Sequence, residues 1–150
     1  MKKVLTIFTP AYNRAYILGK LYNSLLAQSS DDFEWLIVDD GSTDNTKKLI
    51  EEWMKEKKII IKYYYQKNQG KSSAHNMGVL KCNTELFTCV DSDDYLTNDA
   101  VEELVNSYES IKNDDFITGI IARKEAINNK NNRKFPNIKY TTLTDLCYKF

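Results

Sequence analysis

The feature that most constrains this chain is a repeated alternation between short runs of β-branched and aromatic residues and longer amphipathic segments. The short runs predict strands over residues 4–9, 33–38, 59–65, 86–90 and 116–122. Each intervening segment is long enough for a crossover helix, which parallel strands require. The sequence therefore predicts an α/β fold, a three-layer α/β/α sandwich around a mostly parallel central sheet.

Apolar residues at helical spacing predict one helix after each of the first four strands. Asn13 is expected to cap the first helix, and Asn98 is expected to start the fourth. The four apolar stripes consist of Ile17, Leu18, Leu21, Leu25 and Leu26; Leu49, Ile50, Trp53 and Met54; Ala74, Met77, Val79 and Leu80; and Val101, Leu104, Val105, Tyr108 and Ile111.

Length and composition exclude several classes of fold, partner and metal site. A chain of 150 residues can bury one core and is too short for two ordinary domains. Its 21 basic and 21 acidic side chains give zero formal net charge, so no overall field attracts nucleic acid or anionic lipid, and nucleic acid is not an expected partner. The single histidine, His75, excludes a three-histidine zinc site and leaves carboxylates as the plausible ligands of a divalent cation.

Cysteine use and hydropathy favour the cytoplasm. Cys82, Cys89 and Cys147 lie in or beside apolar stretches without metal-ligand or CxxC spacing, so we expect reduced thiols buried in a core. The apolar run after Met1 is too short for a signal peptide, and no stretch reaches membrane-spanning length. Peripheral association with the inner face of the membrane stays open.

Three of the predicted strands run into unusually polar segments, residues 9–14, 39–44 and 91–94. In open α/β sheets, ligands bind beyond the carboxyl ends of the strands. A second Gly-containing turn, residues 68–71, precedes the third predicted helix and can present backbone N–H groups to an anion. We therefore expect the functional site at this edge of the sheet.

The acidic segment 91–94 has two interpretations. Asp91 and Asp93 occupy alternate positions past a strand and suit Mg²⁺ or Mn²⁺, for which a nucleotide diphosphate supplies a second anionic partner. Alternatively, Asp91, Asp93 and Asp94 form a solvated turn and charge cap for the next helix. Three carboxylates within four residues repel one another unless a cation or hydrogen bonds compensate, which favours the metal interpretation.

The order and spacing of these four segments resemble those of family 2 glycosyltransferases of the GT-A fold, over about residues 4–122. The resemblance implies that Asp93 is the main metal-linked residue and that Asp91 and Asp94 contact ribose, metal or sugar. It also implies that Asp40 accepts the imide N–H of uracil, with Asp39 in a supporting role.

Several residues keep two interpretations. Segment 39–44 also suits a turn in which Ser42 or Asp44 caps the next helix. Tyr12 is either a packed aromatic residue or, as the resemblance implies, a ring against the nucleobase. Arg14 and Lys71 are either solvated or in contact with phosphate or a base edge. The candidate site consists of the catalytic residues Asp93 and Asp94, the metal ligands Asp91 and Asp93, and the nucleotide-sugar contacts Pro10, Ala11, Tyr12, Arg14, Asp39, Asp40, Lys71, Asp91 and Ser92.

The resemblance implies a metal-dependent, inverting hexosyltransferase of bacterial polysaccharide or cell-envelope synthesis. It would transfer sugar from a nucleotide-diphospho-sugar, with a UDP-sugar expected, to a saccharide or lipid-linked acceptor. Residues 1–122 would form the donor-binding core, and residues 123–150 a polar excursion and the start of a truncated acceptor-side region. No residue matches the family's general base, so the alternative is a truncated or degenerate module that binds nucleotide sugar without catalysis. The lack of GxGxxG after Thr9 disfavours a dinucleotide dehydrogenase.

Overall fold

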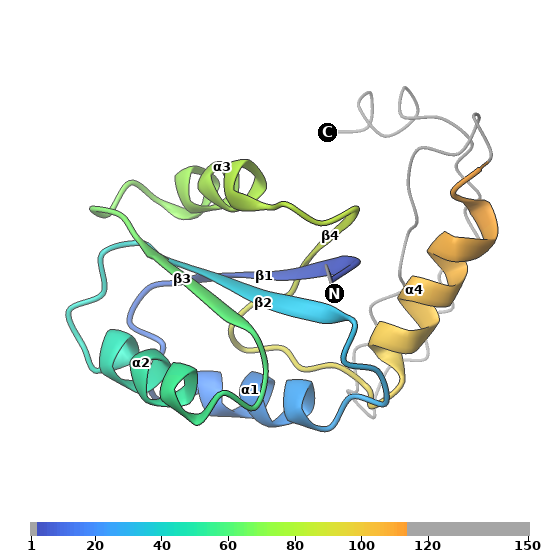
Figure 1. The fold of residues 1–150 in the computed structure, drawn as a ribbon. Helices are drawn as coiled ribbons and strands as arrows, with labels where there is room; N and C mark the ends of the chain where they lie inside the picture. The colour runs from blue at the N-terminus through green and yellow to red at the C-terminus, as the bar shows by residue number, and fades with distance from the viewer. Residues whose placement is uncertain (1–2, 114–150) are drawn as a thin grey trace, which may run out of the picture. The chain divides into compact units, whose positions relative to one another are not determined.

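A computed structural model describes residues 3–113 of the protein. The chain divides into two compact units, Met1–Val105 and Asn106–Phe150, and everything described below about the site lies in the first. The predicted strand 116–122, the division at residue 122 and Cys147 lie outside the described residues. The elements are β1 (Leu5–Ala11), α1 (Leu18–Leu26), β2 (Phe33–Asp39), α2 (Thr46–Glu56), β3 (Ile61–Tyr65), α3 (Lys71–Lys81), β4 (Leu86–Cys89) and α4 (Ala100–Ile111) (Figure 1).

The four strands form one sheet in the order β3-β2-β1-β4, and every pairing is parallel. The prediction of a parallel α/β sheet is therefore confirmed. The chain first adds strands on one side of β1 and then crosses to its other side to form β4. This reversal makes the β1–β4 boundary the topological switch point, where ligands of open α/β sheets bind.

The sheet lies between two helical layers, as Figure 1 shows, with α1 and α2 on one face and α3 on the other. On the α1–α2 face, Tyr22, Trp35 and Trp53 stack, with the rings of Tyr22 and Trp53 4.2 Å apart. The core on this side is formed by buried strand and helix residues that include Leu5, Ile7, Leu18, Leu21, Leu25, Ile37, Ile50 and Val101. The predicted stripe of α1 contributes to it, as do Leu49, Ile50 and Trp53 of α2 and Val101, Leu104 and Val105 of α4. Met54, also expected in the α2 stripe, is instead 40% exposed.

The packing of α3 differs from the prediction. Val79 and Leu80 were expected in its apolar stripe, but their exposed fractions are 51% and 82%. The helix instead buries the small residues Ala74 and Gly78 against the sheet. A Cβ atom at Gly78 would lie 2.4 Å from the Phe8 ring. Glycine therefore allows α3 to approach β1 closely, and the small residues Ala74 and Gly78, together with the half-buried Met77, define its inner face.

Two other predictions are corrected. Cys89 is exposed rather than buried in a core, because it ends β4, which lies at an edge of the sheet that residues 3–113 form. Cys82 is half-buried beside Thr84. Asn13 does not cap α1, which begins at Leu18 after an N-cap without a side-chain hydrogen bond.

Candidate functional site

The parallel register brings the loops that follow β1, β2, β3 and β4 to one edge of the sheet. Ala11 pairs with Asp39, and Phe8 pairs with Cys89. Backbone hydrogen bonds continue past the strands, from Asp40 N–H to the Ala11 carbonyl at 2.8 Å and from Val90 N–H to the Phe8 carbonyl at 2.8 Å. The predicted polar segments therefore begin side by side.

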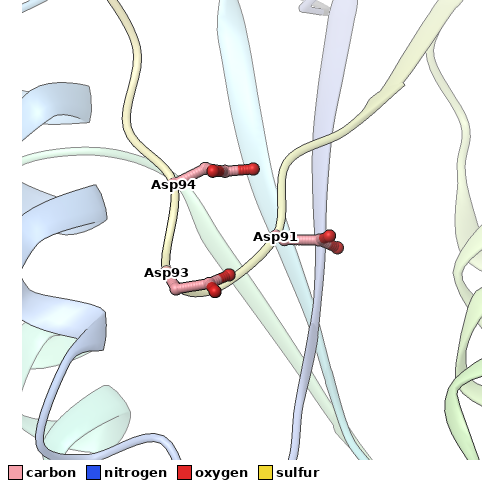
Figure 2. A group of neighbouring side chains, drawn as sticks. All are labelled: Asp91, Asp93 and Asp94. Atoms are coloured by element: carbon pink, nitrogen blue, oxygen red, sulfur yellow. The ribbon is translucent and has the colours of Figure 1, made fainter. Parts of the chain in front are cut away.

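The acidic cluster, Asp91, Asp93 and Asp94, lies in the loop that follows β4. One carboxylate oxygen from each residue lies within 4.8 Å of the others. Figure 2 shows the side chains of Asp93 and Asp94 extending from the loop toward the side on which Asp91 lies. The turn is closed by a hydrogen bond of 3.0 Å from Asp94 N–H to the Asp91 carbonyl. Hard oxygen donors at this separation fit a Mg²⁺ or Mn²⁺ ion that retains several waters.

The structure argues against a helix cap as the explanation of this cluster. The helix α4 begins at Ala100, and the acidic residues of its first turn are Glu102 and Glu103. Helix dipole effects fall off within the first turn. Since Asp94 precedes the helix by six residues, a helix terminus does not compensate the three carboxylates.

Lys71 lies against the acidic cluster. It is the first residue of α3, and its Nζ atom is 2.8 Å from Asp91 Oδ1. The hydrogen bond with Asp91 raises the pKa of Lys71 above its usual value. Gly70 allows this approach because its φ of +88° turns the chain from the loop after β3 into the helix. The structure thus places the side chain of Lys71, one of the predicted site residues, beside the acidic cluster.

Asp40 braces the loop between β3 and α3. Its side chain is 4% exposed and accepts three hydrogen bonds: Gln66 Nε2 donates to Oδ1 at 2.6 Å, Gln69 N–H to Oδ1 at 2.9 Å, and Gly70 N–H to Oδ2 at 2.8 Å. Gly41 brings the two loops together, because its φ is +83° and a Cβ atom there would lie 2.7 Å from the Asn68 nitrogen.

Asp39 is fully buried, and its side chain joins the loop after β2 to strand β3. Its Oδ1 accepts the Ser42 N–H at 2.8 Å, and its Oδ2 accepts the Tyr63 hydroxyl at 2.7 Å. Burial, together with this hydrogen bond to the carboxylate, raises the pKa of Tyr63. Asp39 therefore supports the loop, and Asp44 rather than Ser42 contacts the start of α2 by accepting the Thr46 N–H at 2.9 Å.

The remaining predicted contacts differ in accessibility. Tyr12 is 46% exposed, and Pro10 is half-buried. Arg14 donates to the Tyr16 hydroxyl at 3.0 Å. Ala11 and Ser92 are 2% and 4% exposed, and the Ala11 carbonyl already accepts the Asp40 N–H.

Sequence reasoning missed three residues that organise this edge: Asn13, Tyr63 and Gln66. Ile37 pairs with Tyr63, so strand periodicity places Tyr63 on the face that Asp39 also occupies. Asn13 was attributed to a helix cap, whereas its φ is +53°, a region that asparagine adopts more readily than most residues. Strand periodicity could have identified Tyr63, while Gln66 had no recognisable signal.

The fold and this arrangement agree with a family match over nearly the whole chain. Residues 6–149 match the model described as Glycosyl transferase family 2. The chain belongs to this family, as the sequence resemblance predicted.

Two relatives with similar sequences are much longer than the part that this chain matches. An uncharacterized glycosyltransferase of Haemophilus influenzae is 33% identical over 103 residues, which are 69% of this chain and 41% of that protein. The chondroitin synthase of Escherichia coli is 35% identical over 105 residues, which are 70% of this chain and 15% of the synthase. The chain therefore spans less than half the length of either relative.

Solved structures confirm the predicted GT-A fold. S. aureus TarS 1–349 in complex with UDP is 26% identical, with a TM-score of 0.67 over 73% of this chain and 33% of that one. The mannosyltransferase PcManGT from Pyrobaculum calidifontis, in complex with GDP-Man and Mn²⁺, is 21% identical, with a TM-score of 0.64 over 78% of this chain and 34% of that one.

Within residues 3–113, no helix is long and apolar enough to cross a membrane.

Proposed function

We propose that this chain binds a nucleotide-diphospho-sugar, with a UDP-sugar as donor, and forms the donor half of a glycosyltransferase. The observation that carries the proposal is the acidic cluster at the switch point of the sheet, beside the loops that contain Tyr12 and Asp40. The UDP and UDP-GlcNAc complexes of TarS support this donor class.

A divalent cation, Mn²⁺ or Mg²⁺, belongs to the proposal. Asp93 and Asp91 would hold it, with Asp94 beside them, since their oxygens lie within 4.8 Å of one another and Asp93 is exposed. When bound, the cation supplies charge neutralisation for a departing diphosphate. Lys71, 2.8 Å from Asp91, is placed to add a second positive charge near the same oxygens.

Recognition of the nucleoside falls to the loops after β1 and β2. The exposed ring of Tyr12 offers a stacking surface to the base, and Pro10 and Arg14 flank it. A carboxylate offers about four lone-pair sites. Asp40 uses three of them, one on Oδ2 and two on Oδ1, so one site on Oδ2 is left to accept the imide N–H of uracil.

The acceptor and the stereochemistry are finer parts of the same proposal. We propose inverting transfer of a hexose to a saccharide or lipid-linked acceptor, consistent with the synthesis of polysaccharide named in the Escherichia coli relative. Inversion requires a general base that takes the proton of the acceptor hydroxyl. No residue among positions 3–113 is assigned this role, so donor binding is the activity that these residues support directly.

The test is calorimetric titration of the 150-residue chain with UDP, with and without Mn²⁺. We expect Mn²⁺ to strengthen UDP binding and Asp93→Ala to weaken the metal-dependent binding by about tenfold or more, equivalent to about 1.4 kcal/mol or more. Asp31→Ala is the matched control, because Asp31 is 98% exposed in its side chain and lies outside the site.

The outcomes separate the alternatives. The metal site is refuted if the affinity for UDP is the same with and without Mn²⁺, or if Asp93→Ala leaves that affinity unchanged. Sugar transfer or donor hydrolysis by this chain excludes a purely binding module, whereas metal-dependent UDP binding without turnover favours the non-catalytic alternative.

A further inference from the structure

The loop after β1 has an unusual backbone at Asn13. In the part of the chain that the structure describes, Asn13 and Lys57 are the non-glycine residues with positive φ, at +53° and +54°. Lys57 is the C-cap of α2, where left-handed residues are common. Asn13 ends no helix and lies between Tyr12 and Arg14, so its conformation needs another explanation.

Asn13 joins the loop after β1 to the loop after β2. Its N–H donates to Ser42 Oγ at 2.8 Å. In return, its Oδ1 accepts the Thr43 N–H at 2.8 Å and the Asp44 N–H at 3.2 Å. The left-handed backbone and the side-chain acceptor thus act together in one reciprocal set of bonds.

The next two residues extend this connection. Arg14 N–H donates to Thr46 Oγ1 at 2.9 Å, and Ala15 N–H donates to Asp44 Oδ2 at 3.2 Å. Desolvation of the carboxyl group tends to raise the pKa of Asp44, but hydrogen bonds from Thr46 and Ala15 outweigh it and hold the pKa below its usual value. Asp44 thus contacts Ala15 of one loop and Thr46 at the start of α2, and it keeps the two loops joined.

We propose that Asn13 is a positioning residue for nucleotide binding. It fixes the loop that carries Tyr12 and Arg14 against the loop that begins at Asp40, so that both walls of the nucleoside site are preformed. This inference rests on the proposed function, because it assigns the preformed walls to nucleotide recognition.

Two properties of the site support a positioning role over a role in folding. Thr43 and Asp44, whose N–H groups donate to Asn13 Oδ1, are exposed, and Ser42 is half-buried, so these bonds lie outside the core. Tyr12 is 46% exposed, although hydrogen bonds hold its neighbour Asn13 in place. Because the fold already orders the loop that carries this ring, the ligand does not have to order it on binding, and its affinity is higher for that reason.

The test compares variants that separate the two properties of Asn13. Asn13→Gly permits a positive φ but removes the acceptor, whereas Asn13→Asp retains both. Asp32→Ala is the control, because Asp32 also accepts one backbone N–H, from Val4 at 3.0 Å, in a loop that precedes β2. Each protein is titrated with UDP and Mn²⁺, and its unfolding midpoint in urea is measured.

We expect Asn13→Gly to weaken UDP binding about fivefold or more, since the loops must then be ordered on binding. We expect Asn13→Asp to bind within about twofold of the unaltered chain, and Asp32→Ala to lower the urea midpoint without changing UDP affinity. Ser42→Ala, which removes the reciprocal acceptor, is expected to weaken binding in the same direction and serves if Asn13→Gly does not fold.

Unchanged UDP affinity in both Asn13→Gly and Ser42→Ala overturns the inference. Equal loss of affinity in Asp32→Ala also overturns it, because binding would then follow general stability. If the unaltered chain binds no UDP, the proposed function fails and this inference fails with it, and the first titration distinguishes that case from failure of the inference alone.

Discussion

Removal of the Asp40 side chain should destabilise the protein as well as alter ligand binding. Asp40→Ala deletes the acceptor of three hydrogen bonds, from Gln66 Nε2 and from the backbone N–H groups of Gln69 and Gly70. Gln66 is 6% exposed, so water cannot readily replace its lost partner. The loop that leads into α3 therefore loses these three hydrogen bonds to the residue after β2, although the backbone bond from Gln66 N–H to the Asp39 carbonyl remains.

The magnitude follows from the exposure of the three donors. Hydrogen bonds to a charged acceptor contribute about 1.5–3 kcal/mol each. Gln69 and Gly70 are exposed, and solvation of their N–H groups offsets most of their share. We therefore expect Asp40→Ala to lower the free energy of unfolding by about 2–4 kcal/mol and the Tm by about 8–15 °C.

Urea unfolding followed by circular dichroism measures this loss, and Asp31→Ala is again the control, with an expected change below about 0.5 kcal/mol. Asp40→Asn retains the oxygen that faces Gln66 and Gln69 but turns an amide toward the Gly70 N–H. It should lose less stability than the alanine variant. An Asp40→Ala protein that unfolds at the same urea concentration as the unaltered chain refutes the reasoning.

Two further predictions concern packing and pH. Gly78→Ala should lower stability by about 1–3 kcal/mol in urea unfolding, because its Cβ would lie 2.4 Å from the buried Phe8 ring; Gly19→Ala, with no atom within 4 Å of its Cβ, should be neutral or stabilising. Hydrogen bonds lower the folded pKa of Asp44 below its unfolded value of 3.8, against the effect of burial. Its stabilising contribution is therefore present above that value and is lost as the pH falls through the folded pKa. Asp44→Asn should reduce the difference in unfolding free energy between pH 7 and pH 3, and an undiminished difference would contradict this assignment.

The architecture could be predicted because it depends on repeated local patterns. Four runs of β-branched and aromatic residues became β1 to β4, and their crossover helices required parallel pairing. That pairing alone places the polar strand ends at one edge. The sequence therefore located the neighbourhood of Asp40 and of the acidic cluster without any side-chain geometry.

The errors arose where packing overrides local pattern. In α3, apolar spacing favoured Val79 and Leu80 as inner residues, but close contact with Phe8 selects small side chains and turns Gly78 inward. The role of Asn13 was missed because its partners, Thr43 and Asp44, lie about thirty positions away in sequence. A local motif cannot distinguish a helix cap from an acceptor that serves another loop.

The aspartates of this edge show why one residue type takes different roles. Asp39 and Asp40 are buried and accept hydrogen bonds from their own chain, so folding already compensates their charge. Asp93 is exposed and lies near two further carboxylates, where a bound cation would relieve their repulsion. Burial therefore separates Asp39 and Asp40, whose charge the fold already compensates, from Asp93, whose charge a bound cation would compensate. Asp39 ends the inner strand β2, whereas Asp93 follows β4 at an edge of the sheet that residues 3–113 form, and a DD or DxDD pattern does not encode this difference.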